Sequence, residues 1–141
     1  VLDLFSGSGS LGIEALSRGA EHAVLVDNNR ASMAIISENL QHTKLADKAR
    51  VLNLDYIRAL QLLKKEGAKF DIIFLDPPYN KNFIQNTLKN LIDNDMISKN
   101  GILVAEHNLK DILPEKEGKL KMIRSEKKYG DTVLSFYRPE D

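Results

Sequence analysis

The alternation of two kinds of apolar segment constrains the fold of this chain more than any other feature. Short apolar runs, each typical of a buried strand, occur at 1–5, 23–26, 49–54, 70–75 and 101–106. Segments whose apolar residues have helical spacing occur at 10–18, 30–42, 56–66 and 83–91. Because strand and helix alternate, the sequence predicts an α/β fold, a doubly wound and mostly parallel sheet with helices on both faces.

The C-terminal part of the chain departs from this alternation. Two further strands are predicted, over 121–124 (or as far as Lys127) and over 132–137. Tyr129-Gly130-Asp131 joins them, and this arrangement predicts a hairpin that adds an antiparallel pair at one edge of the sheet. The segment 108–119 has the weakest pattern. With no internal repeat and no linker, residues 1–141 are predicted to form a single domain.

Composition excludes several classes of protein. The apolar fraction is 43%, which is ordinary for a globular protein, and no apolar run is long enough to span a bilayer. Without cysteine there is neither a disulfide nor a thiolate metal site, and the 3 histidines are scattered, so we expect no metal. We expect a cytoplasmic protein. Val1 already lies within a strand pattern, so we also expect that sequence precedes it.

The balance of charge counts mildly against a nucleic-acid partner. Lys and Arg number 20 and Asp and Glu also number 20, whereas nucleic-acid binders usually show a basic excess. The segment 116–128 nevertheless carries six cations against two acids. Its pattern fits a solvated face and a phosphate-contacting patch equally well.

A glycine motif follows the first predicted strand. Gly7, Gly9 and Gly12 form G-x-G-x-x-G, and Asp27 ends the next strand. Glycine lets the backbone approach a ligand closely, and the following helix N-terminus offers free N–H groups. Asp27 can accept hydrogen bonds from both hydroxyls of a ribose. The pattern fits NAD and S-adenosylmethionine about equally, with a purely structural turn as a third alternative.

Two features favour S-adenosylmethionine, namely Asp3 and the segment with Asp55 and Tyr56 that ends the third strand. Asp3, near the end of the first strand, would repel a pyrophosphate but attract the ammonium group of methionine. Asp55 can accept from an adenine amine, with Tyr56 covering the ring, and it can cap the helix that follows at the same time. Asn28 can reach the adenine, although a helix cap is the favoured role.

Asp76-Pro77-Pro78-Tyr79 directly follows the apolar run at 70–75. In a doubly wound sheet, ligands bind beyond the carboxyl ends of the strands where the strand order reverses. The first and fourth strands should flank that point, so the glycine motif and Asp76 are predicted to face one crevice. A plain turn after the strand is the alternative interpretation.

These residue types suit methyl transfer to an aromatic amine, whose lone pair is shared with the ring. Asp76 and the Pro77 carbonyl can accept the two N–H bonds and turn the lone pair toward the methyl group. Pro77 and Pro78 fix the backbone. Tyr79 can stack on the base, which contributes ~1–3 kcal/mol in comparable contacts. Asp76 can also take the proton that the amine loses.

The stretch from Val1 to Ala20, together with Tyr129-Gly130-Asp131-Thr132, resembles the RsmD-type family of class I S-adenosylmethionine-dependent methyltransferases. That family methylates guanine N2 in small-subunit (16S) ribosomal RNA. The resemblance implies a Rossmann-like, seven-stranded sheet with an antiparallel C-terminal hairpin. It also implies a base site at 76–79 and a cofactor site lined by Asp3, Ser6, Gly7, Gly9, Asp27 and Asp55.

Our leading hypothesis is therefore an N2-guanine methyltransferase that acts on small-subunit ribosomal RNA, with ribosomal RNA or the small ribosomal subunit as its partner. The target guanine must be unstacked, so we expect it in a loop or at another exposed position. We expect a monomer. The nearest alternative is a DNA adenine-N6 methyltransferase, which shares Asp-Pro-Pro-Tyr but needs a target-recognition insertion. Further alternatives are a protein-glutamine methyltransferase, an NAD-dependent oxidoreductase and a non-catalytic cofactor-binding module.

Three smaller features carry separate predictions. His107-Asn108, at the end of the fifth strand, can face the crevice, and a role in a loop is an equally good alternative. Tyr129 to Asp131 can touch the substrate, although a tight turn that needs Gly130 is favoured. Glu14 and Arg18 lie one helical turn apart and are predicted to form an exposed ion pair of little energetic weight.

Overall fold

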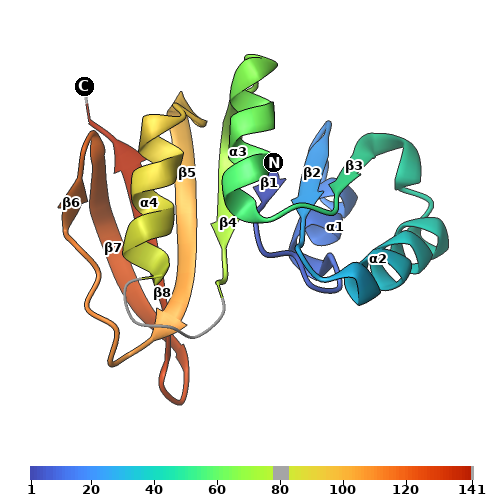
Figure 1. Cartoon of the computed structure of the whole chain (residues 1–141). Helices are drawn as coiled ribbons and strands as arrows, with labels where there is room; N and C mark the ends of the chain where they lie inside the picture. Colours follow the sequence, from blue (N-terminus) through green and yellow to red (C-terminus); the bar gives the residue numbers. More distant parts are fainter. Residues whose placement is uncertain (78–82, 141) are drawn as a thin grey trace.

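A single sheet organises the chain, which a computed structural model describes over residues 1–77 and 83–140 (Figure 1). In this part of the chain the sheet is 8-stranded, in the order β3-β2-β1-β4-β5-β8-β7-β6. The strands are β1 (Leu2–Asp3), β2 (Ala23–Val26), β3 (Ala49–Leu52), β4 (Phe70–Leu75), β5 (Ile97–Asn108), β6 (Lys116–Glu117), β7 (Leu120–Tyr129) and β8 (Thr132–Pro139). The neighbouring strands β3, β2, β1, β4 and β5 pair in parallel. Beyond β5, the strands β8, β7 and β6 add antiparallel pairs. The predicted α/β fold is confirmed.

Helices cover the sheet on both faces, as Figure 1 shows. They are α1 (Ser10–Ser17), α2 (Arg30–Thr43), α3 (Tyr56–Lys65) and α4 (Phe83–Asp93), with a short 3-10 helix, η1 (Ala46–Lys48). On the α3 and α4 side, Leu60 and Leu88 pack with Ile73 in the larger apolar cluster. On the other side, Ile13 of α1 and Ile36 of α2 belong to the second cluster.

Strand order reverses between β1 and β4, which lie side by side at the middle of the sheet. The chain runs outward from β1 through β2 to β3, returns to β4 and then continues outward to β5. This is the switch point at which doubly wound sheets bind ligands, beyond the carboxyl ends of the strands. The fold therefore places the loop after β1 next to Asp76 and Pro77, the described residues after β4, as the sequence predicts.

The strands differ in length from those predicted. β1 and β3 end earlier than expected, whereas β5 begins at Ile97 and extends through Asn108. β7 is 10 residues long, and most of its side chains are exposed, so it shows no clear apolar pattern. The sequence also missed β6, a 2-residue strand, which brings the sheet from the seven strands implied by the resemblance to eight.

The C-terminal hairpin is confirmed. Tyr129 pairs with Thr132, so Gly130 and Asp131 form the turn between them. Gly130 has a φ of 51°, in the left-handed region that favours glycine. No helix within the described ranges is long and apolar enough to cross a membrane.

The basic segment at 116–128 is largely neutralised by acids. Lys116 and Lys121 both approach the carboxylate of Glu140. Lys119 is 2.8 Å from Asp95, Arg124 is 3.4 Å from Glu126, and Lys128 is 2.7 Å from Glu106. These ion pairs favour the solvated face over the phosphate-contacting patch.

Candidate active site

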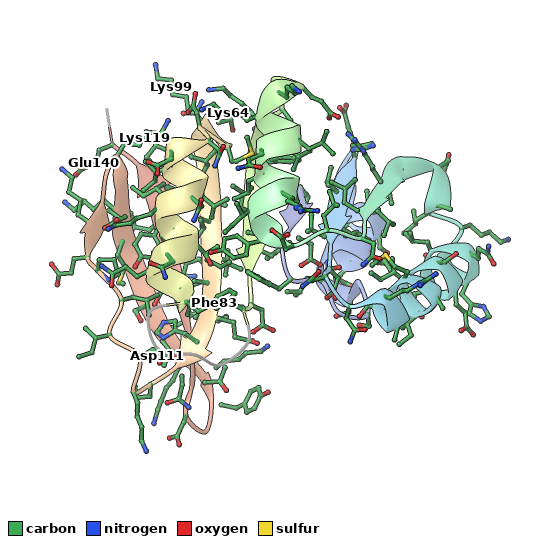
Figure 2. All side chains as sticks on the ribbon, viewed as in Figure 1. Lys64, Phe83, Lys99, Asp111, Lys119 and Glu140 are labelled. Carbon is green, nitrogen blue, oxygen red and sulfur yellow. The ribbon has the colours of Figure 1, made fainter. Side chains whose placement is uncertain are left out.

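A cavity of about 880 Å³ lies at the carboxyl edge of the sheet, where β1 and β4 meet. Figure 2 labels Phe83, a lining residue, at this edge, with Lys64 and Lys99 at the opposite edge. Most of the predicted site residues that the structure describes line this cavity, namely Gly7, Asp27, Asn28, Asp55, Tyr56, Asp76 and Pro77. A second cavity, of about 520 Å³, includes Val1 and Arg50 and none of the predicted site residues.

Asp27 holds the glycine loop in place. Its Oδ2 accepts the N–H of Gly7 at 2.8 Å, and its Oδ1 accepts the N–H of Asn29 at 2.8 Å. A carboxylate oxygen has two acceptor sites, so each oxygen can still accept a hydroxyl from a ligand. Gly7 has a φ of 57°, and a Cβ built on it would meet no atom within 4 Å. The loop therefore exposes bare backbone to the cavity.

Asp3 lies beneath the glycine loop, and it does not line the cavity directly. It is 2% exposed, and its Oδ2 accepts the N–H of Gly12 at 3.0 Å. Burial, the main cause, and the charges of Asp76 and Asp27 together raise the pKa of Asp3 to about 6, against the opposing effect of the hydrogen bond from the Gly12 N–H. The interaction of Asp3 with a ligand ammonium group therefore stays a prediction. The contact that the structure shows for Asp3 is the hydrogen bond from the Gly12 N–H.

Ser6 is the polar group best suited to receive a ligand from within the loop. It is 8% exposed, and its Oγ has no hydrogen-bond partner among the described residues. A buried polar atom without a partner is unusual in a folded protein. Gly9, with a φ of 82°, begins α1 and donates its N–H to the Ser6 carbonyl at 2.8 Å. Ser6 does not itself line the cavity, but its hydroxyl belongs to the same loop as the exposed backbone of Gly7, which does.

The predicted adenine end is formed by two helix starts. Asp55 caps α3, where it accepts the N–H of Arg58 at 3.0 Å, and it also lines the cavity, so both predicted roles are compatible. Asn28 lines the cavity and is exposed. Its favoured role as a helix cap is wrong, because Asn29 caps α2 and accepts the N–H of Ala31 at 2.9 Å.

Three aromatic rings form one wall of the cavity. The centroids of Phe5, Tyr56 and Phe83 are each 5.5 Å from the other two, in tilted or edge-on arrangements. Of these three residues, only Tyr56 is a predicted site residue. Phe5 stood within the glycine motif and Phe83 at a predicted helix start, but nothing in the sequence placed them together. The wall suits a flat, partly apolar group.

Asp76 and Pro77 also line the cavity. Pro78 and Tyr79 lie outside the described residues, so their predicted roles stay predictions. Partial desolvation, the hydrogen bond with Glu106 and the charge of Glu106 raise the pKa of Asp76 to about 6, while Lys128 opposes the shift. A raised pKa makes Asp76 a stronger proton acceptor than an ordinary aspartate. No group of three or more potential metal ligands occurs among the described residues.

The remaining predictions concern residues near the same edge. His107 and Asn108 belong to β5, so the loop role is wrong. His107 Nε2 is 2.7 Å from the Ser135 hydroxyl, which ties the ring to β8. Tyr129 is 68% exposed beside the hairpin turn.

The ion pair between Glu14 and Arg18 is present in α1. The Arg18 Nε is 2.7 Å from Glu14 Oε1, and both side chains are well exposed, at 79% and 61%. Exposed ion pairs contribute little to stability. This part of the prediction is therefore confirmed, and the pair has no part in the cavity.

Comparison with known proteins agrees with the site. A family model described as "Conserved hypothetical protein 95" matches residues 1–138. "Putative rRNA methyltransferase YlbH" of Bacillus subtilis is 42% identical over 137 residues, which is 97% of this chain and 74% of that protein. "Ribosomal RNA small subunit methyltransferase D" of Escherichia coli is 34% identical over 139 residues, covering 99% of this chain and 68% of that protein.

A solved structure extends the similarity to three dimensions. "Putative methyltransferase yhhF from Escherichia coli" has a TM-score of 0.87 and 32% identity to this chain. The match covers 99% of this chain and 76% of the solved chain. The strands and helices that surround the cavity therefore occur in the same arrangement in that relative.

Proposed function

Because the chain belongs to the RsmD-type family of ribosomal RNA methyltransferases, we propose that it transfers a methyl group from S-adenosylmethionine to N2 of a guanine in small-subunit ribosomal RNA. One observation carries the proposal. The loop held by Asp27 and the Asp76-Pro77 pair line the same cavity, although they come from distant parts of the chain. A cofactor face and an acceptor face thus meet at the switch point of the sheet.

The cofactor face has groups for each part of S-adenosylmethionine. Asp27 keeps acceptor capacity for ribose hydroxyls, and the backbone around Gly7 is open to a close approach. The adenine fits between the aromatic wall and Asp55, which also lines the cavity. The Ser6 hydroxyl is free for the methionine part. When bound, the cofactor supplies an electrophilic methyl group on a sulfonium.

The acceptor face explains how an unreactive amine becomes a nucleophile. Asp76 and the Pro77 carbonyl accept the two N–H bonds of guanine N2, which favours the tetrahedral nitrogen of the transition state over the planar ground state. Pro77 has a restricted φ, so its carbonyl is held in position before the base arrives. Asp76 then takes the proton that the nitrogen loses, for which its raised pKa suits it.

The choice of RNA over DNA rests on the relatives. The E. coli relative is named for the small-subunit ribosomal RNA, and the elements of the described residues show no insertion with the size of a separate target-recognition domain. A guanine must leave its stack before its amine can reach Asp76, so the target lies in a loop or in another exposed part of the RNA.

The test separates binding from transfer. Calorimetric titration with S-adenosylhomocysteine, with NADH in parallel, should show saturable binding of the homocysteine compound alone. Small subunits isolated without the modification should accept a labelled methyl group, and digestion should locate it on guanine N2. Asp76→Ala should nearly abolish transfer while it leaves cofactor binding largely intact.

Asp93→Ala is the matched control for that variant, because Asp93 is an exposed aspartate near the end of α4, away from the cavity. It should change neither measurement. Binding of NADH instead of S-adenosylhomocysteine would contradict the proposed class. Labelling of adenine in duplex DNA, with none in ribosomal RNA, would replace the proposed substrate with that of the DNA methylases.

A further inference from the structure

Strand register brings the carboxyl groups of Asp76 and Glu106 together. Leu75 is the partner of Ala105 in the parallel pair of β4 and β5. Asp76 and Glu106 each come one residue later, so their side chains leave the same face of the sheet next to each other. Each carboxyl group accordingly affects the pKa of the other, which Glu106 raises for Asp76 and Asp76 lowers for Glu106. Carboxylates this close resist being ionised together, so the pair holds a proton more tightly than an isolated carboxyl group does.

A bulge in β7 brings a cation to this pair. The register of β7 against β8 shifts between Lys127 and Tyr129, which leaves Lys128 as an extra residue. Bulges of this kind re-aim a side chain and are frequent beside active sites. Lys128 Nζ reaches Glu106 Oε1 at 2.7 Å, although β8 lies between β7 and β5.

The cation decides which carboxyl group stays charged. The hydrogen bond from Lys128 lowers the pKa of Glu106 against the opposing effect of burial, while Glu106 raises the pKa of Asp76. Asp76 also interacts with a second acid, Asp3. The charge of Asp76 raises the pKa of Asp3. Glu106 is thus the member that remains a carboxylate, and Asp76 is the member that takes up a proton.

We propose that Glu106, anchored by Lys128, is a positioning residue that accepts a hydrogen bond from Asp76 once Asp76 has taken the proton of the methylated amine. The inference rests on the proposed function. In the transfer, one N–C bond forms as one S–C bond of the donor breaks, and the amine nitrogen passes one proton to Asp76. The charge of Glu106 stabilises that proton on Asp76, so no additional reactant is required.

The first test needs neither cofactor nor RNA. Carboxyl groups of Asp76 and Glu106 are followed by carbon-13 NMR as the pH is changed. In Glu106→Gln, the titration midpoint of Asp76 should fall from about 6 toward its ordinary 3.8. In Lys128→Met, the titration midpoint of Asp76 should rise instead, because the variant lacks the cation that favours both carboxylates. Lys128→Arg keeps the charge and should titrate like the wild type.

Glu126→Gln is the matched control for Glu106→Gln. Leu134 of β8 pairs with Glu106 on one side and with Glu126 on the other, so the two glutamates occupy the same row of the sheet. Glu126 instead lies 3.4 Å from Arg124 and has no contact with Asp76 among those of the described residues. Its replacement should leave the titration of Asp76 unchanged.

The second test measures single-turnover methyl transfer against pH. Glu106→Gln should slow the step by roughly ten- to a hundredfold near neutral pH. The rate of the variant should also begin to fall at a lower pH than that of the wild type when the solution is acidified. Without the charge of Glu106, Asp76 has a lower pKa and is protonated only at that lower pH. Affinity for S-adenosylhomocysteine should stay unchanged, which separates this role from a loss of cofactor binding.

Each outcome decides a different point. If Glu106→Gln leaves the Asp76 midpoint where it was, the carboxyl pair is absent and the inference is overturned. If the midpoint moves but both the rate and its pH dependence stay the same, Glu106 has no part in the reaction. If the wild type titrates as described but transfers no methyl group to small subunits, the failure lies in the proposed function.

Discussion

The backbone N–H of Gly12 donates to Oδ2 of Asp3 over 3.0 Å, which ties the first turn of α1 to the end of β1. The bond requires a very close approach of helix and strand. A Cβ on Gly12 would lie 2.1 Å from Leu25 Cδ2 and 3.4 Å from Asp3 Oδ2. Gly12 is therefore needed for space, whereas Gly7 and Gly9 are needed for their positive φ values.

Gly12→Ala should destabilise the protein by about 1–3 kcal/mol, as overpacking of a well-packed core usually does. The measurement is urea unfolding of the variant and the wild type. Leu25→Val removes the Cδ2 atom that the new methyl group would strike. The cost of Gly12→Ala should therefore be smaller in the Leu25→Val background, and equal costs in both backgrounds would contradict the steric explanation.

Asp3→Asn should change how stability depends on pH. The folded-state pKa of Asp3 is about 6 and its ordinary value is 3.8. Between these values the folded state holds a proton that the unfolded state has lost, so stability falls as pH rises through this window. A shift of about two pKa units corresponds to about 3 kcal/mol.

The Asn variant keeps an oxygen for the Gly12 N–H but has no charge to bury. It should therefore be more stable than the wild type at pH 7 by up to about 3 kcal/mol, with the advantage vanishing near pH 4. Urea unfolding at several pH values measures this difference. Asp76 also titrates in this range, but it is common to both proteins and largely cancels. Parallel stability curves would show that Asp3 is not the group responsible.

Asp27→Asn should weaken binding of S-adenosylhomocysteine. Both oxygens of Asp27 accept backbone N–H groups, and an amide would turn its NH₂ toward one of them. Losing one charge-assisted hydrogen bond costs about 1.5–3 kcal/mol, which corresponds to roughly ten- to a hundredfold in affinity.

Asp47→Asn is the control for that variant, because Asp47 is an exposed aspartate of η1 that does not line the cavity. Its unfolding free energy should be close to that of the wild type. Calorimetric titration compares the two variants. If Asp27→Asn binds the ligand as tightly as the wild type, the glycine loop does not depend on Asp27 in the way its hydrogen bonds indicate.

Tyr137→Phe should destabilise the protein by about 1 kcal/mol, because the buried Tyr137 hydroxyl donates to the Pro114 carbonyl at 2.6 Å. Burial, and to a lesser extent the charge of Glu117, raises the pKa of Tyr137 to about 12. An ultraviolet titration should thus show one tyrosine ionising well after an ordinary tyrosine, and that late step should vanish in the variant. Tyr129→Phe, at an exposed position, should change neither the stability nor the late ionisation step.

Much of the site follows from the order of segments in the sequence. Asp27 and Asp76 each come directly after an apolar run, and parallel strands bring their carboxyl ends to one edge of the sheet. Their convergence on one cavity could therefore be predicted. Which of two neighbouring residues caps α2 could not be predicted, because either Asn28 or Asn29 satisfies the pattern of a helix cap.

Contacts across the antiparallel part of the sheet could not be predicted. Glu106 and Lys128 are 22 residues apart, and they meet only because β8 inserts between their strands and β7 carries a bulge. The exposed side chains of β7 hide its length from any apolar pattern. Phe5 and Phe83 are brought together by the strand crossover, for which neither segment carries a local signal.

The junction of β1 with β4 divides the labour of the site along the chain. Acidic groups that suit the cofactor, such as Asp27 and Asp55, precede β4 in the sequence. Asp76, Glu106 and Lys128 all come after β4. On the proposed function, substitutions around Glu106 and Lys128 would therefore alter how the amine is presented without changing the groups that hold the methyl donor. In evolutionary terms, such a chain can acquire a new substrate by diverging in one half while the other half is inherited unchanged.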